Sequence, residues 1–168
     1  MARRRTARRT ATTARPEPPW VASYYVEDDG SVPAREALYA GDLPQAVRIA
    51  LLARVVAIRD YPPPSFPTGS PIWSLMSRDP QRGKVDMSGI FEIRDKHGPF
   101  LYRLFCVLDS EASEHGVEDA RVLALLSLGI KPDRTKMPER VYRQARRQAD
   151  RYLATSPRPI LWPPPPDV

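Results

Sequence analysis

Two apolar runs of β-prone residues, separated by a short polar break, constrain the fold of this chain more than any other feature. The runs span residues 89–94 and 100–108, and the break at 95–99 contains Gly98 and Pro99. Aromatic and β-branched residues favour strands, whereas glycine and proline favour turns. The sequence therefore predicts an antiparallel β-hairpin.

Each strand of this hairpin carries one arginine, Arg94 in the first and Arg103 in the second. Side chains alternate between the two faces of a strand, so Glu92 and Arg94 share a face. A buried core sheet would not need arginines at these positions. Two interpretations remain open: the arginines bind a ligand, or they form ion pairs with Glu92 across the hairpin.

The net charge of +6 is distributed unevenly along the 168 residues. Residues 1–15 contain six arginines and no acid, and residues 131–151 contain eight basic and three acidic residues. The segment between them, residues 16–130, carries a charge of −5. Two local basic patches on an acidic body suit binding to a polyanion.

Hydrophobic periodicity and helix-capping signals predict the remaining elements. In chain order they are a strand at 20–27, a helix at 32–40, a helix at 42–59, the hairpin, a strand at 121–128 and a helix at 138–154. The helix at 42–59 has the clearest pattern, because its apolar residues recur every three or four positions. The order of strands and helices indicates an α+β fold.

The chain is expected to contain one domain and two appendages. Residues 1–19 are predicted to be a disordered basic arm and residues 20–154 the folded domain. Residues 155–168 form a proline-rich tail that should be extended and loosely held. Within the domain, residues 60–84 form a proline-rich connection, in which residues 72–76 should anchor the chain onto the core.

The residue types exclude several functional classes. Cys106 is the only cysteine and lies in an apolar run, so it is interpreted as a core residue, and a reducing cytoplasm is the expected location. His97 and His115 lack metal-ligand spacing, and the sequence contains no phosphate-binding or dinucleotide fingerprint. No metal or cofactor is therefore expected. No apolar run reaches membrane-spanning length, so no membrane partner is expected.

The pattern resembles the RelE/ParE superfamily of toxin–antitoxin toxins, and within it the HigB-like (phage Gp49-like) branch. Three features carry this resemblance: Gly89 followed by Glu92-Ile93-Arg94, the pair Tyr102-Arg103 that opens the next strand, and the basic segment 129–138 that leads into an arginine-rich helix. The resemblance implies a RelE-like fold, with an antiparallel sheet of about four strands, two N-terminal helices and a C-terminal helix.

The resemblance also implies an activity and partners. Family members cut mRNA in the ribosomal A site without a metal, leaving a 2′,3′-cyclic phosphate, and a cognate antitoxin protein inhibits them. By this resemblance the expected catalytic residues are Arg94, Arg103, Lys131, Arg134 and Lys136. The residues expected to bind nucleic acid are Arg3, Arg4, Arg5, Arg8, Arg9, Arg143, Arg147 and Tyr102. Arg94 and Arg103 are expected to hold one phosphate together, and Arg103 should be replaceable without loss of the fold.

Competing interpretations accompany these assignments. Tyr102 alternates with Arg103 along the strand, so it is equally a candidate core residue, and the helix arginines could form an ordinary solvated face. Two other functions also fit the sequence. A non-catalytic protein of the same fold could inhibit a protein target, which the dispersed spacing of Lys131, Arg134 and Lys136 favours. A nucleic-acid-binding accessory protein could use the arginine-rich arm.

Overall fold

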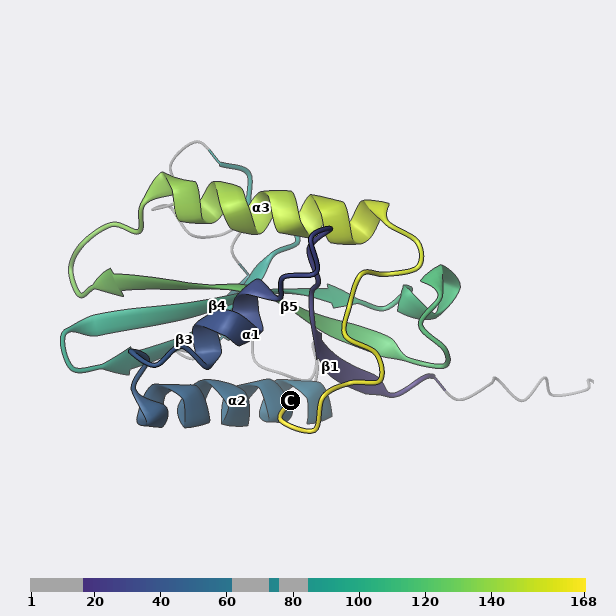
Figure 1. The fold of residues 1–168 in the computed structure, drawn as a ribbon, viewed down its shortest axis with the longest axis horizontal. Coiled ribbons are helices and arrows are strands. Elements are labelled where there is room, and N and C mark those ends of the chain that lie inside the picture. Colours follow the sequence, from purple (N-terminus) through teal and green to yellow (C-terminus); the bar gives the residue numbers. More distant parts are fainter. Residues whose placement is uncertain (1–16, 62–72, 76–84) are drawn as a thin grey trace, which may run out of the picture.

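Five strands form one mixed sheet in the order β1-β5-β4-β3-β2 (Figure 1). The computed structural model describes residues 17–61, 73–75 and 85–168. The strands are β1 (Trp20–Tyr24), β2 (Trp73–Leu75), β3 (Phe91–His97), β4 (Phe100–Asp109) and β5 (Arg121–Pro132). The helices are α1 (Pro33–Leu38), α2 (Gln45–Asp60) and α3 (Glu139–Ala154), and a short 3₁₀ helix, η2, spans Ala112–His115.

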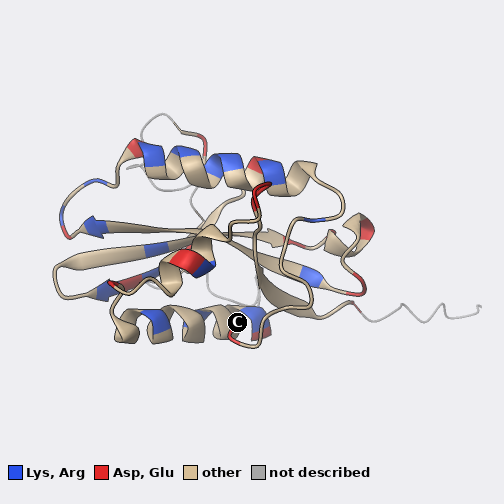
Figure 2. Ribbon diagram, viewed as in Figure 1, with Lys and Arg blue, Asp and Glu red and all other residues tan. Residues whose placement is uncertain are grey.

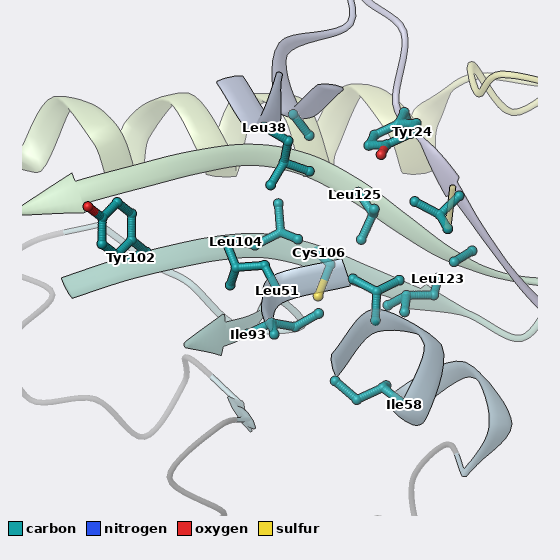
Figure 3. Close-up of a cluster of buried hydrophobic side chains, with 14 of the residues drawn as sticks. Tyr24, Leu38, Leu51, Ile58, Ile93, Tyr102, Leu104, Cys106, Leu123 and Leu125 are labelled. Atoms are coloured by element: carbon teal, nitrogen blue, oxygen red, sulfur yellow. The ribbon is translucent and has the colours of Figure 1, made fainter. Parts of the chain in front are cut away.

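The helices cover the two faces of the sheet separately. Residues of α1 and α2 share one buried cluster with side chains such as Ile93, Leu104 and Leu125 (Figure 3). Residues of α3 share a second cluster with Phe105, Ala124 and other side chains of the opposite face. The structure is therefore an α+β protein with three layers, and the central strands β4 and β5 are buried on both sides.

Local sequence patterns account for the helices and the hairpin. In α2 the side chains of Val47, Leu51, Val55 and Ile58 are fully buried, which confirms the predicted apolar stripe. The N-cap of this helix is Pro44 and not the predicted Asp42, so the helix starts two residues later than predicted. The predicted hairpin is present, with β3 and β4 joined by the two-residue connection Gly98–Pro99.

The sheet differs from the expected antiparallel arrangement of about four strands. It has five strands, and β1 pairs with β5 in the parallel direction, with Trp20 beside Arg121. The additional strand β2 consists of residues from the predicted anchor and pairs with the first half of β3. A parallel pairing between segments a hundred residues apart leaves no signal in a local pattern, because it depends on how the intervening chain folds back.

The C-terminal tail is not loosely held, contrary to the expectation from its prolines. It runs from α3 across the edge of β1 to the end of α2 (Figure 1). The main-chain amide of Leu161 donates to the carbonyl oxygen of Tyr24 at 2.9 Å, and the amide of Val26 donates to the carbonyl oxygen of Pro159 at 2.9 Å. Val168 is buried in the core cluster beneath α2. The tail therefore extends the sheet edge and closes one side of the core.

Two polar contacts fix this tail. The carboxylate of Asp167 accepts hydrogen bonds from the hydroxyls of Tyr24 and Tyr39. Burial, reinforced by the neighbouring carboxylate, raises the pKa of Tyr24 well above its ordinary value. At the other end, the guanidinium of Arg158 donates to Asp109 at 2.8 Å, and both side chains are only 4% exposed.

Arg158 also caps the C-terminal end of α3. Its Nη1 donates to the carbonyl oxygens of Tyr152 at 3.3 Å and Thr155 at 3.2 Å, and to that of Leu153. The last carbonyls of a helix have no partner within the helix, so a buried guanidinium satisfies them. The hydroxyl of Tyr152 donates to the same Asp109 carboxylate at 3.0 Å, which joins tail, helix and β4 in one network.

We expect Arg158→Met to lower the free energy of unfolding by about 3–5 kcal/mol, because it leaves the Asp109 carboxylate buried without its cation. Urea unfolding followed by circular dichroism measures this loss. The double variant Arg158→Met with Asp109→Asn removes both charges and should recover part of the stability. Equal stability of Arg158→Met and the parent protein would show that the network does not hold the tail.

Candidate nucleic-acid interface

Strand register gathers the predicted basic residues at one end of the sheet, on the face that α3 covers. Arg94 of β3 lies directly opposite Arg103 of β4, and Arg103 lies opposite Gly129 of β5. This face also carries Phe105, which belongs to the core cluster shared with α3. Figure 2 shows the basic residues at this end of the sheet and along α3. The structure therefore brings the two hairpin arginines together, as the sequence predicted.

Glu92 binds both arginines. Its carboxylate oxygens lie 2.9 Å from Nη1 of Arg103 and 3.1 Å from Nε of Arg94, and the hydroxyl of Ser74 donates to it at 3.2 Å. The side chains of Glu92 and Arg103 are 2% and 10% exposed, whereas that of Arg94 is 36% exposed. The ion-pair interpretation thus holds for both arginines, and Arg94 is the one that solvent reaches.

Arg94 can still bind an anion while it pairs with Glu92. The ion pair uses Nε, and among the described residues no other contact occupies its two terminal amino groups. A guanidinium that keeps both terminal nitrogens can bind a phosphate with two parallel hydrogen bonds. The ion pair with Glu92 therefore leaves the terminal nitrogens of Arg94 available to an anion.

The predicted basic segment, residues 129–138, begins within β5 and continues into the following turn, and it has one buried and two exposed cations. Lys131 is 5% exposed, and its ammonium group donates to the main-chain oxygen of Thr135, which closes the turn that follows the strand. Arg134 and Lys136 are exposed on this turn. Lys96 of β3 joins the same region through an ion pair with Asp133 at 2.6 Å, and this contact lowers the pKa of the Asp133 carboxyl.

Gly129 allows α3 to approach this part of the sheet. A Cβ atom at this position would lie 2.9 Å from Cε of Met137, 3.0 Å from Cγ1 of Val141 and 3.1 Å from Cε2 of Phe105. Any side chain here would push the start of α3 away. Gly129 thus allows the start of α3 to pack closely on β5, next to the two arginines.

The outer face of α3 is mainly basic. Arg140, Arg143 and Arg147 are exposed, and Arg143 forms an ion pair with Glu139 at 2.6 Å. Within the described residues, Arg140 and Arg147 have no ion pair. Arg147 lies beside the acidic stretch Glu27–Asp29, so the N-terminal half of the helix is the more positive part.

Other predicted binding residues lie elsewhere. Tyr102 is 4% exposed and belongs to the core cluster beneath α2, on the opposite face from Arg103. Its assignment to the nucleic-acid surface is therefore corrected, because strand alternation separates the two residues. The arm residues Arg3, Arg4, Arg5, Arg8 and Arg9 lie outside the described residues.

The described residues contain no group of three or more histidine, cysteine or acidic side chains that could hold a metal ion. Among the helices described, none has the length and apolar character needed to cross a membrane. Cys106 is fully buried in the core, and burial raises the pKa of its thiol well above the ordinary value.

The sequence analysis missed the contribution of Lys96 and the unequal burial of the two arginines. Lys96 follows Arg94 by two positions, so strand alternation already placed both on one face. The burial of Arg103 had no local signal, because it depends on the central position of β4 and on the neighbouring strands.

Arg103→Ala should lower the free energy of unfolding by about 3–5 kcal/mol, since the buried Glu92 carboxylate then loses the cation closest to it. Arg94→Ala, at a partly exposed ion pair, should cost no more than about 1 kcal/mol. Thermal unfolding of the two variants side by side measures the difference. Equal losses would mean that Glu92 does not depend on Arg103. This expectation replaces the earlier one that Arg103 can be removed without affecting the fold.

No match was found when the sequence was compared with protein-family models, with curated proteins and with solved structures.

Proposed function

We propose that this protein binds RNA at the basic end of its sheet and acts as a RelE-type toxin that cleaves ribosome-bound mRNA. The observation that carries the proposal is the gathering of Arg94, Arg103 and Lys131 on one face of three adjacent strands, beside the exposed Arg134 and Lys136. A cognate antitoxin and a RelE-like fold belong to the same proposal.

The proposed reaction is attack of a ribose 2′-oxygen on the neighbouring phosphorus. The bond to the leaving 5′-oxygen breaks, and a 2′,3′-cyclic phosphate and a 5′-hydroxyl result. One proton leaves the 2′-hydroxyl and one reaches the leaving oxygen. Negative charge accumulates on the phosphate oxygens in the transition state, so fixed cations accelerate the reaction.

The residues divide these tasks according to their exposure. Arg94 is the arginine that can contact the phosphate, because its side chain is 36% exposed and its ion pair uses Nε alone. Arg103 is a positioning residue, since it neutralises the buried Glu92 carboxylate that holds Arg94. Lys131 positions the turn that carries Arg134 and Lys136, and these two exposed cations are the further groups that can reach RNA.

A second candidate function is RNA binding without cleavage. Arg103 is buried and paired, so only one of the two hairpin arginines can reach a phosphate. Binding needs only the exposed cations of the turn and of α3.

We expect the protein to cleave mRNA in a translation extract, as read by primer extension, and to lose activity when purified ribosomes are absent. Arg94→Ala should lower the cleavage rate on the order of a hundredfold, because one fixed donor to the phosphate is lost. Arg48→Ala, a matched change on the opposite layer, should leave the rate unchanged. Absence of cleavage by the parent protein would refute the catalytic function and favour binding alone.

RNA binding should show a salt dependence that reports the turn cations. In the double variant Arg134→Gln with Lys136→Gln, the slope of log affinity against log salt should fall by about 1.4, at about 0.7 for each lost phosphate contact on a single strand. Fluorescence anisotropy with a labelled oligonucleotide measures both slopes. The paired control is Arg35→Gln with Arg48→Gln on α1 and α2. An equal decrease in both double variants would show that RNA does not contact the turn specifically.

A further inference from the structure

A cavity of about 360 Å³ lies where α2 meets the β3–β4 strand pair. Arg54 of α2 lines it together with Asp95 and Tyr102, which lie directly opposite each other in the strand register. Strand alternation places these two side chains on the α2 face. Arg94, Lys96 and Arg103 also line the cavity, so it extends to the edge of the hairpin that carries the basic residues. The cavity therefore adjoins the proposed RNA site and shares Arg94 with it, while Arg54, Asp95 and Tyr102 belong to the cavity alone.

Arg54 supplies a partly exposed cation at this cavity. Its Nη1 lies 2.7 Å from a carboxylate oxygen of Asp95 and also donates to the main-chain oxygen of Arg94. The side chain is 25% exposed, and both of these contacts use the same nitrogen. A guanidinium carries five N–H donors in a fixed plane, so several remain for a bound anion. Lys96, which is also paired with Asp133, adds a second cation to the lining.

Tyr102 supplies a hydroxyl that the described residues leave without a hydrogen-bond partner. The residue is 4% exposed, and its ring packs with the core, while its oxygen points away from the neighbouring apolar side chains (Figure 3). The hydroxyl oxygen is not one of the fully buried polar atoms that lack a partner, so solvent reaches it at the cavity, and a ligand can replace that water. Its position at the cavity makes it available to both.

A second hollow of about 390 Å³ adjoins the first, because Tyr102 lines both. Its lining is mostly apolar and includes Leu43, Pro44, Phe100 and Ile130. Phe100 and Ile130 are 41% and 48% exposed, which is unusual for large apolar side chains. Together the two hollows provide a polar, cationic end and an apolar end on one face of the molecule.

We propose that these two hollows bind a small organic anion with an apolar body. Its acid group contacts Arg54 and the Tyr102 hydroxyl, and its apolar part lies against Phe100 and Ile130. The volumes are within the range of ligand sites in proteins, and the arrangement of a few convergent polar groups beside an apolar wall is typical of them. The inference does not rest on the proposed RNA function.

Fluorescence of 8-anilino-1-naphthalenesulfonate, an aromatic anion, tests this proposal on the full chain. Bound probe should be displaced by decanoate or by decyl phosphate, and the more effective of the two identifies the acid as a carboxylate or a phosphate ester. Decanol, which has the same apolar chain and no charge, should displace it at least tenfold less effectively. The proposal is overturned if decanol competes as well as the two acids.

Variants locate the binding. Arg54→Gln and Tyr102→Phe should each weaken displacement by the acid about tenfold, because each removes a hydrogen bond to a charged group. Arg140→Gln on α3 makes the same change of charge outside the cavity and should have no effect. Tyr102→Phe keeps the packing of the ring, so it decides the outcome even if Arg54→Gln fails to fold. Unchanged affinity in Tyr102→Phe, or an equal loss in Arg140→Gln, would refute the site.

Discussion

The carboxylate of Glu92 makes the arrangement of the hairpin end possible. Two arginines directly opposite each other on neighbouring strands repel, and one of them is nearly buried. A buried cation needs a partner because its hydration is lost, and Glu92 provides one for Arg103 while it also pairs with Arg94. The same carboxylate thus stabilises the sheet and sets which guanidinium can meet a ligand.

The β3–β4 hairpin presents different chemistry on its two faces. On the α3 face, Arg94 and Arg103 lie beside the basic segment that follows β5. On the α2 face, Asp95 and Tyr102 lie beside Arg54 and the apolar end of the sheet. Successive side chains of a strand point to opposite faces, so the two faces carry different residues. The helices that cover each face then determine which of these residues stay exposed. One pair of strands can therefore support two adjoining binding sites, one on each face.

The tail shows that a proline-rich segment can be integral to a fold. Prolines lack an amide donor, but they still accept hydrogen bonds, as the carbonyl oxygen of Pro159 does from Val26. The non-proline residues supply the rest, with Leu161 donating to β1, and Arg158 and Asp167 forming the polar contacts at either end. The tail is therefore bound to the domain at both ends, by the buried Arg158–Asp109 pair and by the buried side chain of Val168.

The sequence by itself determined the elements whose signals are local. The hairpin, the stripe of α2 and the span of α3 follow from periodicity and turn residues, and alternation alone predicted that Tyr102 and Arg103 lie on opposite faces. The tertiary structure decided the parallel pairing of β1 with β5, the position of β2, the docking of the tail and the burial of Arg103. These features depend on contacts between residues far apart in the chain. A periodic pattern predicts the secondary structure of a segment and its apolar face, but it does not predict which distant segment packs against that face.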